Sequence, residues 1–175
     1  MTDEKQSMSA GTKAILKAWL IAGTLDICCA MIWSYTARML KHAPDPNPLD
    51  VLNGVGRVAL GKGILSAEVL GNYALMCVIG LVVHYAIAFT WTLIFFWAWP
   101  KFKFLQGDKI VVGLCYGIVI WAVMTFAIVP LRIMTWPVFV AKNLIIGGAI
   151  IMLAVGLPIS IIIGNYYSKH ESKTQ

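Results

Sequence analysis

Four apolar runs, each about 25 residues long, constrain the fold of this chain more than any other feature. They occupy residues 14–37, 72–97, 110–134 and 143–167. A bilayer core about 30 Å thick is crossed by about 20 helical residues that rise about 1.5 Å each. Because lipid offers no partner to backbone N–H and C=O groups, each run is expected to form an α-helix. The sequence therefore predicts an all-α polytopic membrane protein with four transmembrane helices, in a single membrane domain over residues 1–175.

The composition supports the same fold class and excludes several others. Of the 175 residues, 59% are hydrophobic and 13% are charged, whereas an ordinary soluble domain has roughly 45–50% and 25%. Such a chain is not disordered, not a disulfide-stapled secreted module and not a typical soluble enzyme. A transmembrane β-barrel would alternate polar and apolar residues. Uninterrupted apolar stretches such as residues 144–146 and 161–163 exclude that pattern.

Basic residues lie in the short segments between the apolar runs, and the net charge is +6. This placement favours anionic lipid headgroups over nucleic acid as the counterpart of the charge. Four spans place both termini on one side of the membrane. That side carries eight lysines and the other side carries six lysines and arginines. The positive-inside rule therefore predicts cytoplasmic termini.

The loop between the first two runs is expected to contain a short interfacial helix over about residues 48–60. Three alternating prolines in residues 44–48 stiffen the start of the loop. Asn47 is placed to cap a helix that begins at Pro48. The apolar residues that follow recur at helical spacing and predict an amphipathic helix at the membrane surface: Leu49, Leu52, Val55, Ala59 and Leu60.

Two ionisable residues, Asp26 and His84, lie near the middle of the first two runs. Each is the thirteenth residue of its run, so two antiparallel helices bring them to the same depth. A lone carboxylate at the bilayer centre costs about 2.5–3.5 kcal/mol on insertion scales, and a hydrogen bond from an imidazole relieves much of that cost. The sequence therefore predicts a contact between the two side chains. The contact is either a polar clamp between two helices or a proton relay.

Small residues and prolines predict how the helices pack and where they bend. Small residues let helix backbones approach closely, and prolines bend a helix because they lack an N–H group. The G-x-x-x-G pattern over residues 113–117 is expected to serve internal packing, and a homodimer seam is the alternative. The residues predicted to pack helices are Gly23, Gly80, Gly113 and Gly117, and the predicted kinks are at Pro130 and Pro158.

The chain carries no pattern that predicts catalysis, a cofactor or a metal. It has no G-x-S-x-G elbow, and of the three histidines only His84 lies inside an apolar run. The glycines of residues 56–62 fit G-x-x-x-x-G-K, but Gly63 stands where a phosphate-binding loop needs Ser or Thr. The four cysteines lie within apolar runs and form no C-x-x-C pair. We therefore expect a non-enzymatic protein with no catalytic, cofactor-binding or metal-ligating residues.

Several segments resemble a group of small bacterial membrane proteins of unknown function. This group is similar to the YagU-type inner-membrane proteins, and the resemblance runs from about Ile15 to Tyr167. It implies a four-helix integral protein of the bacterial inner (cytoplasmic) membrane, with no assigned reaction. The group usually has a small polar residue where this chain has Arg132. The segments that carry the resemblance are residues 22–26, 83–89, 116–121 and 128–131.

Two functions are compatible with these features. The first is a structural or accessory subunit of a larger membrane complex, or an envelope-stress protein, which acts by packing. The second is a small proton-linked transporter or channel that uses Asp26 and His84. An enzyme acting on lipid or quinone is a weaker third hypothesis. The expected partners are membrane lipids and a larger complex or a second copy of the chain, with no nucleic acid.

Overall fold

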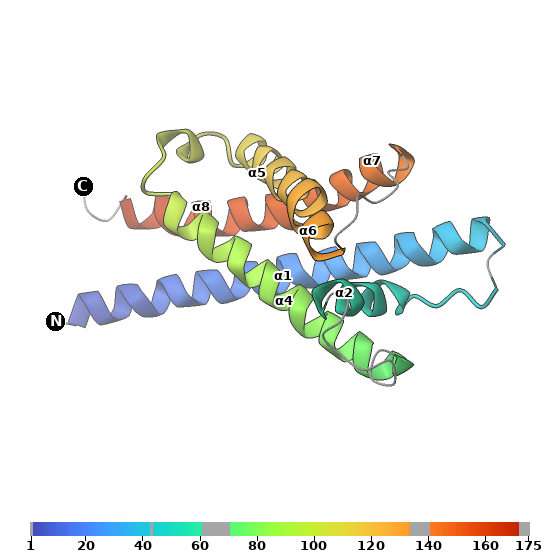
Figure 1. Ribbon diagram of the computed structural model, residues 1–175. Helices are drawn as coiled ribbons and strands as arrows, with labels where there is room; N and C mark the ends of the chain where they lie inside the picture. Colours follow the sequence, from blue (N-terminus) through green and yellow to red (C-terminus); the bar gives the residue numbers. More distant parts are fainter. Residues whose placement is uncertain (1, 43, 61–70, 134–140, 172–175) are drawn as a thin grey trace.

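The computed structural model describes residues 2–42, 44–60, 71–133 and 141–171, which contain helices, turns and no β-strand (Figure 1). The predicted all-α fold, with four long apolar helices and a short helix between the first two, is confirmed. Two π-helical segments interrupt the third and fourth spans. The elements are α1 (Thr2–Leu40), α2 (Asp50–Leu60), α4 (Tyr73–Ala98), the 3₁₀-helix η1 (Lys103–Gln106), α5 (Lys109–Val123), the π-helix η2 (Met124–Ile128), α6 (Val129–Ile133), α7 (Ala141–Ile150), the π-helix η3 (Ile151–Gly156) and α8 (Leu157–Glu171).

Four helical stretches are long and apolar enough to cross a membrane. The third consists of α5, η2 and α6 in continuous succession, and the fourth of α7, η3 and α8. The first stretch and the fourth extend beyond the predicted runs at both ends. The predicted end of the third run at Met134, and Trp136 beyond it, lie outside the described residues. The stretches are Ala10–Leu40, Tyr73–Ala98, Lys109–Leu131 and Ala141–His170.

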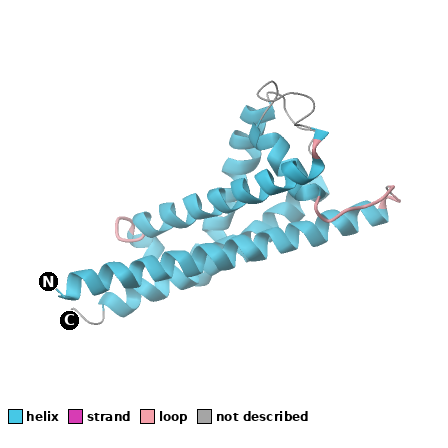
Figure 2. Cartoon of the chain, turned by 90° about the horizontal axis from the view of Figure 1, so that it is seen from below, coloured by secondary structure: helices cyan, strands magenta, loops and turns pink. Residues whose placement is uncertain are grey.

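The four stretches run alternately up and down, so both termini lie at the same end of the molecule (Figures 1 and 2). We call this the terminal end; it also carries the connection between α4 and α5, residues 99–108. The opposite end, which we call the α2 end, carries α2, the last turns of α1 and the first turns of α4. The helices spread apart toward the α2 end, and α2 lies beside α1 and α4 there (Figure 1).

The terminal end is held together by an aromatic cluster. It consists of Phe95, Phe96, Trp99, Tyr116 and Tyr167, whose neighbouring ring centroids lie 4.7–5.9 Å apart. The phenol of Tyr116 donates to Trp91 O at 2.6 Å, and that of Tyr167 donates to Phe96 O at 3.0 Å. Each of these rings contributes a large apolar surface to the contacts in the cluster, and both phenol groups have a hydrogen-bond acceptor. This end of the molecule is therefore a packed core.

Glycines bring the third and fourth stretches into backbone contact. A Cβ atom at Gly117 would lie 2.5 Å from Met152 Cα, and one at Gly113 would lie 2.9 Å from Gly156 O. In turn, a Cβ at Gly156 would overlap Gly113 O. The face that carries the G-x-x-x-G pattern is thus occupied within one chain.

A second pair of glycines brings α2 against α4. A Cβ atom at Gly56 would overlap Met76 O, and one at Gly80 would overlap Leu52 O. The N-terminus of α2 is tied to its neighbours as well, because Asp50 pairs with Arg38 at 2.8 Å. The helix predicted in this loop therefore packs directly across a membrane-spanning helix.

The start of α2 differs slightly from the prediction. The helix begins at Asp50, two residues after Pro48. Asn47 still acts at this start, because its Oδ1 accepts from Leu49 N at 2.9 Å. Residues 48–49 form a turn because the hydrogen bond from Leu49 N to the Asn47 side chain competes with the backbone bonding of a first helical turn.

Each proline in the apolar stretches follows a π-helical segment. Pro130 comes two residues after η2, and Pro158 comes two residues after η3. A proline ring clashes with the carbonyl group four residues earlier, and it has no N–H for that carbonyl. A wider π turn removes the clash because the backbone there bonds five residues apart. The irregularities at the two predicted kink positions therefore take the form of wide turns.

Asp108 caps α5, and its removal gives a small, local prediction. Its Oδ1 accepts from Ile110 N at 2.8 Å and from Val111 N at 3.0 Å. Asp108→Ala is expected to lower the free energy of unfolding by about 1 kcal/mol, because two N–H groups lose their partner. Denaturant titration of the detergent-solubilised protein measures the change. Asp108→Asn keeps an acceptor and is the control; equal losses in both variants would contradict the capping role.

Candidate functional site

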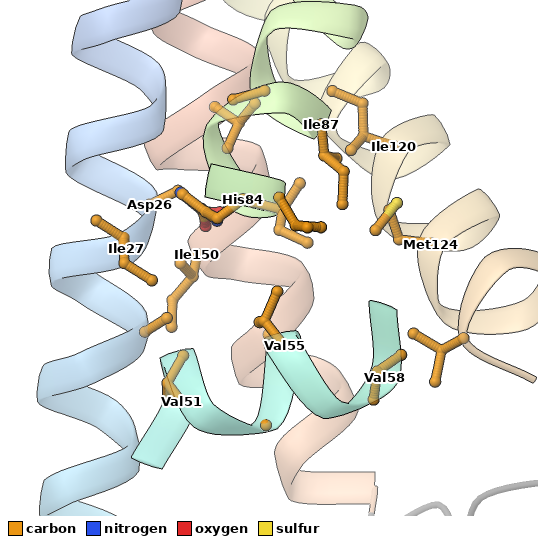
Figure 3. Close-up of a pocket in the computed structure, with 18 of the residues that line it drawn as sticks. Asp26, Ile27, Val51, Val55, Val58, His84, Ile87, Ile120, Met124 and Ile150 are labelled. Carbon is orange, nitrogen blue, oxygen red and sulfur yellow. The ribbon is translucent and has the colours of Figure 1, made fainter. Parts of the chain in front are cut away.

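A cavity of about 790 Å³ lies between α2 and the spread halves of the four stretches (Figure 3). Helices α1, α2 and α4, the end of α5, and the segments around η2 and η3 all contribute to its wall. Most of the wall is aliphatic. Figure 3 shows Val51, Val55 and Val58 of α2 on one side, with Met124 and Ile150 across from them. The valines spaced three or four residues apart give α2 an apolar face that turns toward this cavity.

Asp26 and His84 meet in the wall of this cavity. Their side chains point toward one another from α1 and α4 (Figure 3), with 3.9 Å between Asp26 Oδ2 and His84 Nδ1. That separation is too long for a hydrogen bond. Helices α1 and α4 run antiparallel and bring the two residues to one level, as their equal places in the two apolar runs predicted.

The second ring nitrogen of His84 is held by the backbone of α1. His84 Nε2 lies 2.9 Å from Gly23 O. A carbonyl oxygen can only accept, so Nε2 carries the hydrogen in this bond. In the neutral ring, Nδ1 is then the nitrogen with the free lone pair, and Nδ1 is the atom that faces Asp26. The geometry leaves a proton acceptor and a carboxyl group facing each other across a short gap.

Both side chains keep some accessible surface. The side chain of Asp26 is 22% exposed and that of His84 is 12% exposed. Because both residues line the cavity, this surface can meet a molecule that occupies it.

Contacts around Gly23 fix α1 against α4 at the level of the pair. A Cβ atom at Gly23 would lie 3.0 Å from the ring of Tyr85. The Tyr85 phenol shares a 2.8 Å hydrogen bond with Thr24, and Trp19 Nε1 donates to Tyr85 O at 2.8 Å. These contacts hold Asp26 and His84 in their relative positions.

The cavity extends toward the α2 end. At the α2 end it is lined by Ser34, Asp50 and the exposed Gly54. Ser34 is eight residues beyond Asp26 on α1, a rise of about 12 Å. Toward the terminal end the lining includes Ile120 and Val155, which belong to the packed core beside the aromatic cluster. The cavity therefore reaches from the α2 end to the ionisable pair and stops at the packed terminal end.

Other candidate groups remain apart. His42 is an exposed residue at the α2 end, and His170 lies near the C-terminus, so neither approaches His84. The cysteines are all free, and Cys77 Sγ contacts Leu49 O at 3.6 Å. Over the described ranges, no three His, Cys, Asp or Glu side chains gather closely enough to hold a metal ion.

Sequence reasoning missed the roles of several residues that shape the site. Val55 was placed on the apolar face of the loop helix, but Val51, Val58, Tyr85 and Trp19 were given no part in a site, and Gly56 and Gly156 were not among the glycines predicted to pack helices. Trp19 lies seven residues before Asp26, on the same face of α1, and Tyr85 follows His84 directly. The i−7 spacing was a usable signal for Trp19. Whether α2 lies in the cavity wall depends on how the loop packs against the other helices, and the loop sequence alone does not indicate where it packs.

Comparisons with known proteins leave the resemblance noted in the sequence as a prediction. No protein-family model, no curated protein and no solved structure matches the chain. The fold and the site therefore stand on this chain's own residues. By the length and composition of its helices, the chain is a four-span integral membrane protein, and its ionisable pair lies in the wall of an apolar cavity.

Proposed function

We propose that this protein is a small proton-linked transporter of the bacterial inner membrane, in which Asp26 and His84 exchange a proton with the contents of the cavity. The observation that carries this proposal is the position of the pair in the wall of an apolar cavity that reaches one end of the molecule. Ionisable groups inside a membrane are costly, and they commonly mark ion and proton pathways.

The geometry of the pair supports proton exchange. With His84 Nε2–H bound to Gly23 O, the carboxyl of Asp26 and the lone pair of Nδ1 face each other without a hydrogen bond between them. A proton on either group is therefore not locked by a direct contact. Charge is poorly screened in an apolar cavity, so a change in the occupant's charge changes which group holds the proton.

The charge distribution supports an orientation with cytoplasmic termini. Eight lysines fall on the terminal side and six basic residues on the other. In this orientation the α2 end, toward which the cavity extends, faces the periplasm. The cavity then samples the proton concentration outside the cytoplasm.

A non-enzymatic accessory role is the second candidate, and one observation favours it. The 2.9 Å hydrogen bond from His84 Nε2 to Gly23 O ties α4 to α1, as a polar clamp would. In this role the protein acts by packing, within a larger membrane complex, with a second copy, or in envelope stress. The clamp needs the imidazole and does not need an ionisable carboxyl at Asp26.

Proton movement in liposomes tests the proposal. Reconstituted protein with a pH-sensitive dye inside the vesicles is challenged with a panel of solutes: organic cations, organic anions, amino acids and sugars. We expect at least one solute class to move protons, and Asp26→Asn to abolish that movement. Loss is expected because the amide binds no proton at any ordinary pH.

Asp45→Asn is the matched control, since it makes the same change at an exposed loop position outside the cavity. It should leave proton movement unchanged. If no solute in the panel moves protons through the wild-type protein, the transporter proposal is wrong and the packing role is favoured. If Asp26→Asn still moves protons, the assignment of the pair is wrong.

A further inference from the structure

We propose that the occupant of the cavity is a lipophilic monovalent cation, which exchanges with a proton at the Asp26–His84 pair. This inference rests on the proposed transport function and names its substrate class. It is carried by the charges and the shape of the cavity wall.

The ionisable groups of the wall favour a positive occupant. Among the described lining residues these groups are Asp26, Asp50 and His84, and none is a lysine or an arginine. Asp50 is already neutralised, because Arg38 lies 2.8 Å from its Oδ2 and the phenol of Tyr73 donates to its Oδ1 at 3.0 Å. Whenever Asp26 is ionised and His84 is neutral, the described part of the wall therefore carries one uncompensated negative charge.

The lining residues from the remaining elements are uncharged, and Lys142 of α7 lies over the lining ring of Trp33. The residues that α5, η2, α6, α7 and η3 contribute to the wall are aliphatic, glycine or methionine. Helix α2 contributes Asp50 at the α2 end, and α4 contributes His84. Proton binding at the site thus depends on Asp26 and His84, and the other charged groups at lining residues are Asp50, Arg38 paired with Asp50, and Lys142 over Trp33.

The shape and chemistry of the wall fit an apolar body. The cavity volume of about 790 Å³ falls within the roughly 300–1,000 Å³ of small-molecule sites. Two indole rings, Trp33 and Trp91, line it, and aromatic faces attract cations. The ring of Trp33 already has the Lys142 ammonium 5.7 Å from its centroid. Trp91, toward the terminal end, is therefore the ring left for the occupant.

Other classes of occupant fit less well. An anion would meet the carboxylate of Asp26 and no lysine or arginine among the described lining residues. A sugar would bury many hydroxyl groups against aliphatic side chains that offer no hydrogen bonds. A lipophilic cation fits in both respects, because the aliphatic wall matches its apolar surface and the Asp26 carboxylate matches its charge.

Exchange conserves the charge of the site. With one proton bound to the Asp26–His84 pair, the wall is neutral. When a monovalent cation binds, that proton is released to water. The only bond broken is the one that held the proton to the carboxyl or imidazole group. Departure of the cation lets the proton return. Binding of the cation is therefore expected to weaken as the pH falls, because protons compete for the same negative charge.

Two probes of nearly equal size and opposite charge test the inference. Tetraphenylphosphonium and tetraphenylborate are titrated separately into the full-length wild-type protein in detergent, with protein-free micelles as the blank. We expect the cation to bind at least about tenfold more tightly than the anion. In weakly buffered solution below neutral pH, its binding should release a proton.

Asp26→Asn should lower the affinity for tetraphenylphosphonium by at least about tenfold, and Asp45→Asn should not change it. Equal binding of the two probes would overturn the inference and would indicate a site that selects for apolar volume alone. Failure of this inference is distinct from failure of the transport proposal. If an anion or a neutral solute drives Asp26-dependent proton movement in liposomes while tetraphenylphosphonium does not bind, transport stands and the cation assignment falls.

Discussion

Gly156→Ala is expected to lower the free energy of unfolding by about 3 kcal/mol, at the upper end of what overpacking by one methyl group costs. A Cβ atom at this position would overlap Gly113 O, and it would lie 2.9 Å from Gly117 N and 3.0 Å from Gly117 Cα. All three atoms belong to the backbone of α5, so no side-chain rotation can relieve the clash. The two helices must therefore separate, and the packing of the third and fourth stretches is lost.

Gly147→Ala is the matched control for this prediction. Gly147 lies in the same helical stretch, and a Cβ atom there would meet nothing within 4 Å. This variant should be neutral or stabilised by up to about 1 kcal/mol, because alanine favours a helix more than glycine does. Unfolding by denaturing detergent, followed by circular dichroism, measures both changes. Equal stability of the two variants would show that the glycine contact does not control helix packing.

Gly56→Ala is expected to release α2 from α4 while the rest of the fold persists. The added Cβ would overlap Met76 O and would lie 3.2 Å from Gly80 N. Separation costs the burial of Leu52 and Asn53, which are 6% and 9% exposed. We expect amide hydrogen exchange in residues 50–60 to accelerate by at least about tenfold, which corresponds to about 1.4 kcal/mol.

Gly54→Ala provides the control for α2, since the two glycines are two residues apart and a Cβ at Gly54 would meet nothing within 4 Å. Its exchange rates in residues 50–60 should match those of the wild type or fall below them. Mass spectrometry after proteolysis measures exchange for α2 and for α8 in one experiment. Faster exchange throughout α8 in Gly56→Ala would contradict a local release, because α8 lies in the packed terminal end.

The four long helices could be predicted from sequence because the signal is local. A run of apolar residues in lipid has one way to satisfy its backbone, so length and composition decide the outcome. The beginnings of two helices follow from local chemistry as well. Asn72 precedes α4 and accepts from Leu75 N at 3.0 Å, and Asp108 precedes α5 in the same manner.

The ionisable pair could be anticipated because depth in a membrane follows from residue number. Asp26 and His84 occupy equal positions in antiparallel runs, and the structure places their side chains 3.9 Å apart. The hydrogen bond from His84 to Gly23 O could not be anticipated, because it depends on how α4 is rotated about its own axis. That rotation is set by side chains such as Tyr85 from several elements at once.

The cavity itself could not be predicted from the sequence. It exists because the helices spread at the α2 end and α2 fills only part of the space between them. The apolar spacing in residues 48–60 indicated one buried face of a helix, but membrane lipid and protein are equally good partners for such a face. The contact of Gly56 with α4 decides between them, and it is a long-range contact.

The two π-helical segments have a mechanical consequence for the space they border. Met124 and Ile128 of η2, and Ile151 and Val155 of η3, all line the cavity. A π turn holds one residue more than the regular winding, so rewinding it would translate the segment beyond it by about 1.5 Å and turn that segment by about 100°. If α6 moves relative to α5, or α7 relative to α8, such a screw motion exchanges the side chains that face the occupant while α8 stays in the packed terminal end. The volume available to a bound molecule is therefore coupled to the winding of two helices.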